Sequence, residues 1–322
     1  MKQILVYEFG GPEKMRLADV EKPSPATGEV LVKLAAIGVN FIDIYFRTGL
    51  YQAPLPVSLG MEGAGVVEAV GPDVADIKVG DRVAYCMVRG SYAEYAVVPA
   101  SQIVALPPAL DFQSAAAALL QGMTAHYLTH STYPLQAADA CLVHAAAGGT
   151  GNLIVQMAKM RGARVLATVG TREKAALAKA AGADEVILYA ECEFDQEVRL
   201  LTGGRGVDVV YDSVGAATFM RSLNSLRPRG MMVSFGNASG AVPSIEPLLL
   251  SQKGSLFLTR PTLAHYAATR GELLQRAGDV LGWVASGQLK LRIERVYPLA
   301  EAAQAHIDLA SRRTAGKLLL IA

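Results

Sequence analysis

The chain has 322 residues, 52% of them hydrophobic, and this length and composition predict a large core divided between two domains. A formal net charge of +1 gives no basis for a nucleic-acid partner or for binding to a membrane surface. No apolar run approaches the roughly 20 residues that a membrane span needs, and Glu8 interrupts the N-terminal stretch where a secretory signal would stay apolar. The three cysteines (Cys86, Cys141 and Cys192) are scattered and odd in number, which is typical of a reducing compartment and indicates the cytoplasm.

The first third of the chain is predicted to be rich in β-strands. Short runs of β-branched and apolar residues alternate with turn signals such as Gly10-Gly11-Pro12 and Gly71-Pro72. Several short strands at this spacing favour a compact, barrel-like β-domain. The expected strands cover residues 3–7, 29–36, 65–70, 82–85 and 93–99.

From residue 140 onward, strand and helix patterns alternate, which favours a doubly wound parallel sheet and an α/β fold. Before it, Asp111 is expected to cap a helix that runs to about residue 128. The expected strands are 142–143, 164–169, 185–189, 207–212, 230–235 and 255–259, and the expected helices are 152–162, 173–181, 195–202, 216–226 and 270–286. The last segment is predicted as a β-stretch (289–297), a helix (299–311) and a strand (317–321) that rejoins the first domain. The predicted division is 1–124, 125–265 and 266–322, of which the first and third form one domain.

The most informative loop lies between the strand at 142–143 and the following helix. Residues 146–151 read Ala-Ala-Gly-Gly-Thr-Gly, which is G-x-G-x-x-G with alanine at the first glycine position. In a strand–turn–helix context, such glycines let the backbone approach a pyrophosphate, and the helix N-terminus favours the anion. The alternative is that these small residues serve only close packing of the helix on the strand.

The end of the next predicted strand (164–169) bears on the choice of dinucleotide. An NAD site usually carries Asp or Glu there to accept the ribose hydroxyls. This chain has Gly170-Thr171-Arg172-Glu173-Lys174, with no acidic residue at the strand tip, so Arg172 and Lys174 favour the 2′-phosphate of NADPH. The alternative is that both cations belong to a solvated helix start.

Seven motifs together carry a resemblance that covers essentially the whole chain. The sequence is similar to the zinc-free quinone oxidoreductases related to zeta-crystallin, within the medium-chain dehydrogenase/reductase superfamily. The resemblance implies a GroES-like catalytic domain, a Rossmann domain that binds NADPH, and metal-free reduction of quinones. The motifs are GVNFIDIYFRTGLY (38–51), LGMEGAGVVEAVG (59–71), VGDRVAY (79–85), LLQGMTAHYL (119–128), HAAAGGTG (144–151), YDSVG (211–215) and MVSFGNASG (232–240).

The chain departs from the zinc-dependent relatives at their metal ligands. Asn40 stands where those relatives have cysteine, Met61 stands where they have the histidine before Glu62, and their four-cysteine lobe has no counterpart. Zinc needs a nearly closed set of nitrogen, sulfur and carboxylate ligands, so neither zinc nor any other metal is expected. Without zinc to acidify an alcohol, the favoured substrates are quinones or activated enones, which already accept hydride.

The resemblance also implies the residues of the site. Arg260 could stabilise negative charge on a quinone oxygen, and a tyrosine hydroxyl could donate a hydrogen bond there. The alternatives are that Asn40 and Asp43 only fix a turn and that the tyrosines are packing aromatics; Glu62 is interpreted as structural. The implied substrate cavity comprises Asn40, Asp43, Tyr45, Tyr51 and Arg260, without an assured general acid.

The resemblance also implies the residues that contact the cofactor, and many of them lie just after the predicted strands of the parallel sheet. Arg312 is assigned as a phosphate-side cation, although its neighbour Arg313 is an alternative. The implied contacts are Asn40, Thr124, Ala147, Gly148, Gly149, Thr150, Gly170, Thr171, Lys174, Tyr189, Ser213, Phe235, Gly236, Asn237, Thr259, Arg260 and Arg312.

Two alternative functions and a homodimer are also compatible with the resemblance. An enal or enone reductase would share the fold, the cofactor and the metal-free site. A crystallin-like structural role or RNA binding has no support in the charge pattern, because no basic stretch with interleaved aromatics occurs. The family suggests a homodimer in which the exposed edge strand 255–259 meets its symmetry mate.

Overall fold

The computed structural model describes residues 1–322, which divide into two compact units. Unit 1 comprises Met1–Met123 and Ala267–Ala322, and unit 2 comprises Thr124–Tyr266. Helix α2 (Phe112–Tyr127) begins in unit 1 and ends in unit 2. None of the helices combines the length and the apolar character that crossing a membrane would require.

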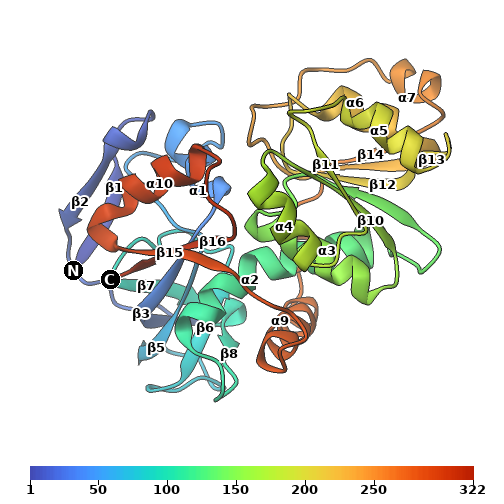
Figure 1. Cartoon of the computed structure of the whole chain (residues 1–322). Coiled ribbons are helices and arrows are strands. Elements are labelled where there is room, and N and C mark those ends of the chain that lie inside the picture. Colours follow the sequence, from blue (N-terminus) through green and yellow to red (C-terminus); the bar gives the residue numbers. More distant parts are fainter. The chain divides into compact units, whose positions relative to one another are not determined.

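Unit 1 is built on two sheets (Figure 1). The smaller has the antiparallel order β2-β1-β4; the larger has the order β15-β16-β3-β5-β6-β8, with β7 paired to β3 as well. All neighbours in the larger sheet are antiparallel except β15 and β16. The strands are β1 (Lys2–Val6), β2 (Met15–Asp19), β3 (Glu29–Val39), β4 (Val57–Ser58), β5 (Glu62–Val70), β6 (Arg82–Cys86), β7 (Tyr95–Pro99), β8 (Val104–Ala105), β15 (Ile293–Pro298) and β16 (Lys317–Ile321).

The sequence pattern missed the first helix of unit 1, α1 (Phe41–Thr48). Its letters FIDIYFRT are mostly β-branched or aromatic, and these residue types favour strands over helices. The helix forms because Asp43 accepts a hydrogen bond from the backbone N–H of the N-cap residue Asn40 (2.8 Å), and because Gly49 ends it with φ of 76°. The other helices of unit 1 are α9 (Arg270–Ala285) and α10 (Ala302–Ala310).

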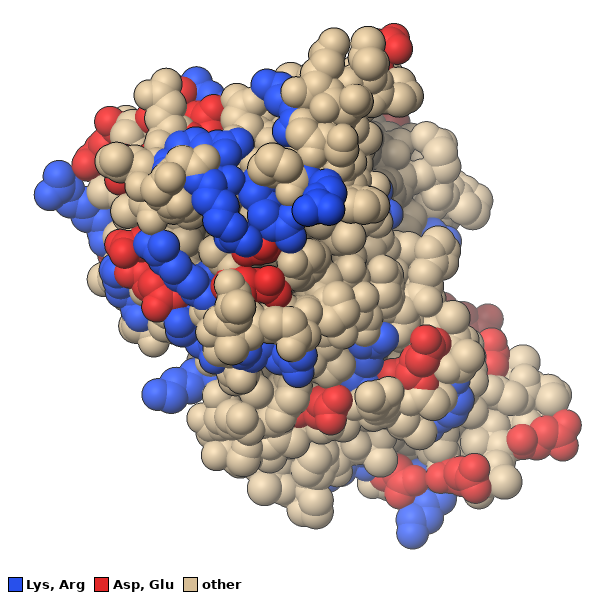
Figure 2. Space-filling model, turned by 90° about the vertical axis from the view of Figure 1, so that its right-hand side faces the viewer, with Lys and Arg blue, Asp and Glu red and all other residues tan.

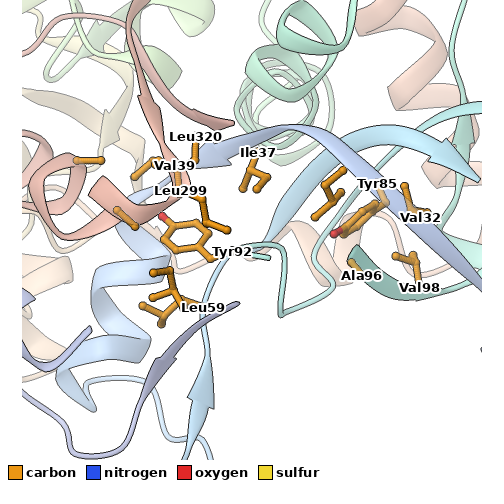
Figure 3. Packing of buried hydrophobic residues seen from close by; sticks show 14 of the residues in the cluster. Val32, Ile37, Val39, Leu59, Tyr85, Tyr92, Ala96, Val98, Leu299 and Leu320 are labelled. Atoms are coloured by element: carbon orange, nitrogen blue, oxygen red, sulfur yellow. The ribbon is translucent and has the colours of Figure 1, made fainter. Parts of the chain in front are cut away.

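The core of unit 1 contains three fully buried tyrosines, Tyr85, Tyr92 and Tyr297, of which Figure 3 labels the first two. Tyr92 lies near Leu59 and Leu299, whereas Tyr85 lies in another part of the same core cluster, near Val32. A buried tyrosine hydroxyl needs a polar partner, and Tyr85 donates its hydrogen bond to Ser91 (2.9 Å). The hydroxyl of Tyr92 enters a polar network that bears on the candidate site.

The C-terminal segment pairs with an early strand of unit 1, because β16 lies antiparallel to β3. In this pairing Leu318 lies opposite Val39, so the residues that precede and follow them, Lys317 and Asn40, are brought to the same place. The expected β-stretch 289–297 is shorter in the structure, where only Ile293–Pro298 pair with β16. The expected helix 299–311 begins as a 3-10 turn and becomes α-helical at Ala302.

Unit 2 contains the predicted all-parallel sheet, with the order β11-β10-β9-β12-β13-β14. The strands are β9 (Ala140–Val143), β10 (Arg164–Val169), β11 (Glu185–Leu188), β12 (Val207–Asp212), β13 (Leu226–Ser234) and β14 (Phe257–Thr259). The helices are α3 (Gly149–Met160), α4 (Arg172–Ala180), α5 (Phe194–Leu201), α6 (Phe219–Ser225), α7 (Leu248–Gln252) and α8 (Leu263–Tyr266). β13 starts earlier than the expected 230–235, and α6 is shorter than the expected 216–226.

The strand order of unit 2 reverses between β9 and β12. The chain leaves β9 through α3 toward β10, and it leaves β12 through α6 toward β13, in the opposite direction. With right-handed crossovers, α3 and α4 cover one face of the sheet and α5 and α6 cover the other (Figure 1). Ligands of such sheets bind at this reversal, outside the carboxyl ends of the strands.

Basic and acidic side chains are mixed on the face shown in Figure 2, where one denser group of lysine and arginine side chains stands beside aspartates and glutamates. Across the whole chain, several oppositely charged side chains form exposed ion pairs, such as Arg172 with Glu191 and Arg292 with Glu294. Exposed pairs of this kind contribute little to stability. The mixture agrees with the net charge of +1.

Candidate functional site

The glycine loop after β9 forms a tight backbone turn. The N–H of Gly148 donates to the carbonyl of Ala145 (2.8 Å), and Ala145 itself has a positive φ of 50°. A Cβ at Gly151 would lie only 2.4 Å from that carbonyl oxygen, so this position requires glycine. The loop is therefore a tight turn that needs glycine at position 151, and it follows the carboxyl end of β9.

Helix α3 begins immediately after this turn, with Gly148 as its N-cap residue and no side chain capping it. The first N–H groups of a helix have no partners inside the helix, and the aligned peptide dipoles add positive potential there. Gly149 and Thr150 lie in this first turn. An uncapped helix start behind a glycine turn fits the pyrophosphate of a dinucleotide.

The end of β10 carries the residues expected around the adenosine phosphate. The hydroxyl oxygen of Tyr189 lies 2.6 Å from where a Cβ of Gly170 would be, so glycine leaves room for the tyrosine. Thr171 caps α4 by accepting from the backbone N–H of Lys174 (3.3 Å). Arg172 already faces Glu191 in an exposed ion pair (3.4 Å). The structure thus brings Gly170, Thr171 and Tyr189 together and gives one of the two predicted cations an acidic partner.

The loops after β12 and β13 approach each other closely. A Cβ at Gly236 would lie 2.4 Å from the carbonyl oxygen of Ser213, so the backbone of one loop rests on the other. With its amide oriented to satisfy both ends, Asn237 donates to the carbonyl of Gly236 (2.9 Å) and accepts from the guanidinium of Arg260 (3.1 Å). Four of the predicted cofactor residues therefore form one cluster beside the strand reversal.

The remaining predicted residues are placed as follows. Phe235 follows β13 directly, and Thr259 ends β14. Thr124 is the first residue of unit 2, within α2. Arg312 and Arg313 belong to unit 1, where they follow α10, and Arg312 has a positive φ of 58°.

In unit 1, Asn40 lies in a buried polar cluster together with Glu62, and only 5% of its surface is exposed. Its amide nitrogen donates to Glu62 Oε1 (2.7 Å), and its amide oxygen accepts from Lys317 Nζ (2.8 Å) and from Gln121 Nε2 (3.3 Å). Lys317 also forms an ion pair with Glu62, which in turn accepts from the backbone N–H of Leu120 (2.8 Å). Glu62 is completely buried, and both of its carboxylate oxygens accept hydrogen bonds.

This cluster does not fit a zinc ion. The carboxylate of Glu62 is already occupied by the ammonium group of Lys317, and the neighbouring positions offer an amide and a thioether. No group of three or more His, Cys, Asp or Glu residues in the chain is placed to hold a metal ion. Zinc prefers thiolate, imidazole and carboxylate ligands, and an ammonium group repels any cation.

The second buried network of unit 1 starts at Asp43, which has no exposed surface. Its Oδ2 accepts from the backbone N–H of Asn40 and from the hydroxyl of Tyr92 (3.0 Å), whereas its Oδ1 is buried without a partner. Tyr92 continues to His306 Nε2 (3.0 Å), and His306 Nδ1 meets the guanidinium of Arg47 (3.1 Å). Asp43 is thus linked to Arg47 through two side chains from elsewhere in the chain.

The direction of every hydrogen bond in this network follows from its arginine. A guanidinium group only donates, so His306 Nδ1 must accept and its proton must sit on Nε2. His306 then donates to the oxygen of Tyr92, which leaves the hydroxyl hydrogen of Tyr92 for Asp43. Burial, together with the charge of Arg47, lowers the pKa of His306 to about 3 and keeps its ring neutral. Burial raises the pKa of Asp43 to about 7, although the hydrogen bonds from Asn40 and Tyr92 oppose this rise.

The two predicted tyrosines are in contact. The rings of Tyr45 and Tyr51 are 5.2 Å apart at their centroids, and Tyr51 also meets Phe46 edge-on at 5.7 Å. Tyr45 is 7% exposed, so most of its ring packs inside unit 1, whereas Tyr51 is only half-buried. Tyr51 is the more accessible hydroxyl-bearing ring of the pair.

Sequence reasoning missed Lys317, Tyr92 and His306, which complete the two buried networks of unit 1. Lys317 heads the last strand, and a lysine at the start of a strand ordinarily faces water. The available signal was weak: Lys317 precedes the apolar run Leu318–Ile321 directly, in a strand that had to pair inside the first domain. Nothing in the sequence indicated that His306 would meet Tyr92, 214 positions away.

Comparisons with known proteins give a class that agrees with this geometry. The family model "Alcohol dehydrogenase GroES-like domain" matches residues 26–108, and the model "Zinc-binding dehydrogenase" matches residues 149–275. A GroES-like domain followed by a parallel nucleotide-binding sheet defines a medium-chain dehydrogenase/reductase.

Similarity to individual proteins is more specific. The quinone oxidoreductase of Pseudomonas aeruginosa is 47% identical over 99% of both chains, and the 2-haloacrylate reductase of a Burkholderia species is 41% identical over 98% of both. The structure of Escherichia coli quinone oxidoreductase complexed with NADPH superimposes with a TM-score of 0.98 at 44% identity and full coverage of both chains. The chain belongs to the quinone oxidoreductase family.

Proposed function

We propose that this chain reduces quinones with NADPH as the reductant and without a metal ion. The observation that carries the proposal is the glycine turn at Gly148–Gly151, which leaves the start of α3 uncapped at the strand reversal, in a member of the quinone oxidoreductase family. NADPH would supply the hydride for the reaction. The chain's own residues would bind the cofactor, orient the acceptor and exclude water.

Most of the proposed cofactor residues of unit 2 lie in the loops and helix starts that follow the strands of its parallel sheet. Gly148, Gly149 and Thr150 would hold the pyrophosphate with backbone N–H groups, with Ala147 beside them. Gly170, Thr171, Lys174 and Tyr189 would surround the adenosine phosphate, and the Asn237–Arg260 pair would lie on the nicotinamide side. Thr124, Ser213, Phe235, Gly236, Thr259 and, from unit 1, Asn40 and Arg312 complete the proposed set.

On the acceptor side we propose Asn40, Tyr45, Tyr51 and Arg260 as substrate-cavity residues. Arg260 would stabilise the negative charge that develops on a quinone oxygen. Asp43 would hold the start of helix α1 in place, because its side chain is fully buried and caps the helix that carries Tyr45. This makes Asp43 a supporting residue and not one that touches the substrate.

The test is a steady-state comparison of acceptors. NADPH oxidation by the purified protein should be fastest with 1,4-benzoquinone or 9,10-phenanthrenequinone. The alternative is an enone reductase, which the similarity to a 2-haloacrylate reductase favours. Clear preference for an alkenal or a 2-haloacrylate over both quinones would replace the proposal by this alternative.

The choice of NADPH over NADH can be tested at Lys174. Its side chain follows the Thr171 cap at the end of β10, where the 2′-phosphate is proposed to bind. Lys174→Glu is expected to raise the Kd for NADPH at least tenfold, because it places a carboxylate near the phosphate, and to change the Kd for NADH less than twofold. Titration of cofactor fluorescence measures both constants. Equal losses for the two cofactors would show that Lys174 does not read the phosphate.

We further propose that residues 1–124 and 266–322 form the catalytic domain and that residues 125–265 form the NADPH-binding domain.

We also propose that two copies of the chain form a dimer in which their β14 strands pair. This strand lies at the sheet edge, with Phe257 58% exposed and Leu258 37% exposed. Pairing would cover both side chains and the unpaired backbone groups of the edge. Sedimentation at micromolar concentration is expected to show a dimer for the parent protein and a monomer for the Phe257→Glu variant.

The cytoplasm is the proposed location of the protein, and its three free cysteine thiols support this proposal.

A further inference from the structure

The amide of Asn40 is held at both ends by side chains that cannot exchange their hydrogen-bonding roles. An ammonium group only donates and a carboxylate only accepts. Lys317 Nζ therefore fixes which end of the amide is the oxygen, and Glu62 Oε1 fixes which end is the nitrogen. Turning the amide over would place NH2 against ammonium and oxygen against carboxylate, so a single orientation is stable.

This arrangement leaves one N–H of Asn40 weakly used. Nδ2 carries two hydrogens; one goes to Glu62 at 2.7 Å, and the other has only the carbonyl of Gly38 at 3.4 Å. A contact of that length is a poor hydrogen bond. Because the amide oxygen accepts from a cation, the amide is polarised and this N–H becomes a stronger donor.

The ion pair behind the amide is unusual for a strand start. Lys317 is 2% exposed and Glu62 is fully buried, and charges taken out of water are destabilising unless they are paired. Apolar residues of similar volume would often serve stability equally well. What an apolar pair could not do is hold the amide of Asn40 in one orientation, and both Lys317 and Glu62 contact that amide.

We propose that Lys317 is a positioning residue: with Glu62 it orients the Asn40 amide so that an N–H, and not the oxygen, is available to the acceptor. An N–H donor favours the negative charge that develops on a quinone oxygen during reduction, whereas a carbonyl oxygen would repel it. The inference rests on the proposed quinone reduction, because Asn40 is assigned there to the acceptor side.

The test separates positioning from stability by removing both charges together. Lys317→Met alone leaves Glu62 buried and unpaired, so its Tm should fall. Lys317→Met with Glu62→Gln should recover Tm to within a few degrees of the parent but keep kcat for 1,4-benzoquinone at least tenfold lower. Lys33→Met, at an exposed lysine of β3, is the matched control and should change neither Tm nor kcat. Recovery of both Tm and kcat in the double variant would overturn the proposal.

A mutant cycle asks whether Lys317 acts through Asn40. In an Asn40→Ala background the Lys317→Met/Glu62→Gln pair should cause less than a twofold further loss of kcat, because the oriented amide is already gone. If the loss of kcat caused by Asn40→Ala and the loss caused by the Lys317→Met/Glu62→Gln pair multiplied in the combined variant, the proposal would be contradicted. If the double variant does not fold, Lys317→Gln with Glu62→Gln replaces it: amides at both contacts let the Asn40 amide take either orientation, so kcat should still fall about tenfold. An unchanged kcat in this pair of substitutions would overturn the proposal.

A readout without turnover keeps this inference separate from the proposed function. The side-chain amide signal of Asn40, assigned by its absence in Asn40→Ala, should show slow hydrogen exchange in the parent and at least tenfold faster exchange in the double variant. Equal exchange would refute the positioning role. A parent that reduces no quinone would refute the proposed function but not the orientation of Asn40.

Discussion

Gly38→Ala is expected to destabilise unit 1 by about 3–5 kcal/mol, the loss typical of breaking a buried ion pair. A Cβ at Gly38 would lie 2.0 Å from Glu62 Oε1, far inside van der Waals contact. A carboxylate at the end of a side chain can usually move aside, but this one is fully buried and held by Asn40, Leu120 and Lys317. Making room for one methyl group therefore means giving up those hydrogen bonds.

Unfolding of unit 1 can be followed by the fluorescence of Trp283, since it is the chain's one tryptophan and lies in unit 1. The matched control is Gly278→Ala in α9, where a Cβ would meet nothing within 4 Å. Alanine is favoured over glycine inside a helix by roughly 0.5–1 kcal/mol, so the control should be neutral or slightly stabilising. A Gly38→Ala variant as stable as the parent would show that Glu62 can shift at little cost.

The second large effect concerns pH, through Asp43 and His306. The folded-state pKa of Asp43 is raised to about 7, so between pH 4 and pH 7 the folded state keeps a proton that the unfolded chain has lost. Stability due to Asp43 therefore falls as pH rises through this range, by on the order of 4 kcal/mol in total. The folded-state pKa of His306 is lowered to about 3, so the unfolded chain holds the extra proton up to about pH 6.5. Stability due to His306 therefore rises with pH by a similar amount.

In the parent these two slopes oppose each other between about pH 4 and pH 6.5, so each should be visible only when the other group is removed. Asp43→Asn is expected to give stability that rises with pH more steeply than the parent's up to about pH 6.5. His306→Gln is expected to give stability that falls between about pH 4 and pH 7. Denaturant unfolding of Trp283 fluorescence at several pH values measures both, with Asp76→Asn as an exposed control that should run parallel to the parent. Parallel curves for all four proteins would mean that neither buried group titrates as described.

Local patterns predicted the architecture of unit 2 well. Near-continuous apolar runs mark strands buried on both faces, and the turn residues between them mark the connections. The glycine loop was recognisable for the same reason, because the turn before α3 needs small residues in consecutive positions. Asp111 also behaves as predicted, since it accepts from the backbone N–H of Ser114 (2.7 Å) at the start of α2. The domain limits and the individual site residues remain predictions.

Unit 1 was harder to predict because its structure depends on contacts distant in sequence. Helix α1 has strand-like letters, and its formation depends on caps at Asn40 and Gly49 more than on residue preference. The short strands β4 and β8 have two residues each and no pattern of their own. They exist because longer neighbours offer them backbone partners.

The sequence alone determined the fold class, the glycine turn and the replacement of the zinc ligands, because each is written in neighbouring residues whose spacing has a direct physical meaning. Only the tertiary structure decided what surrounds Asn40. Lys317 is 277 positions from Asn40, and His306 is 259 positions from Arg47. A lysine and a histidine with no local motif become buried partners only when the last helix and strand pack against the first domain. No periodicity in the chain records such a meeting.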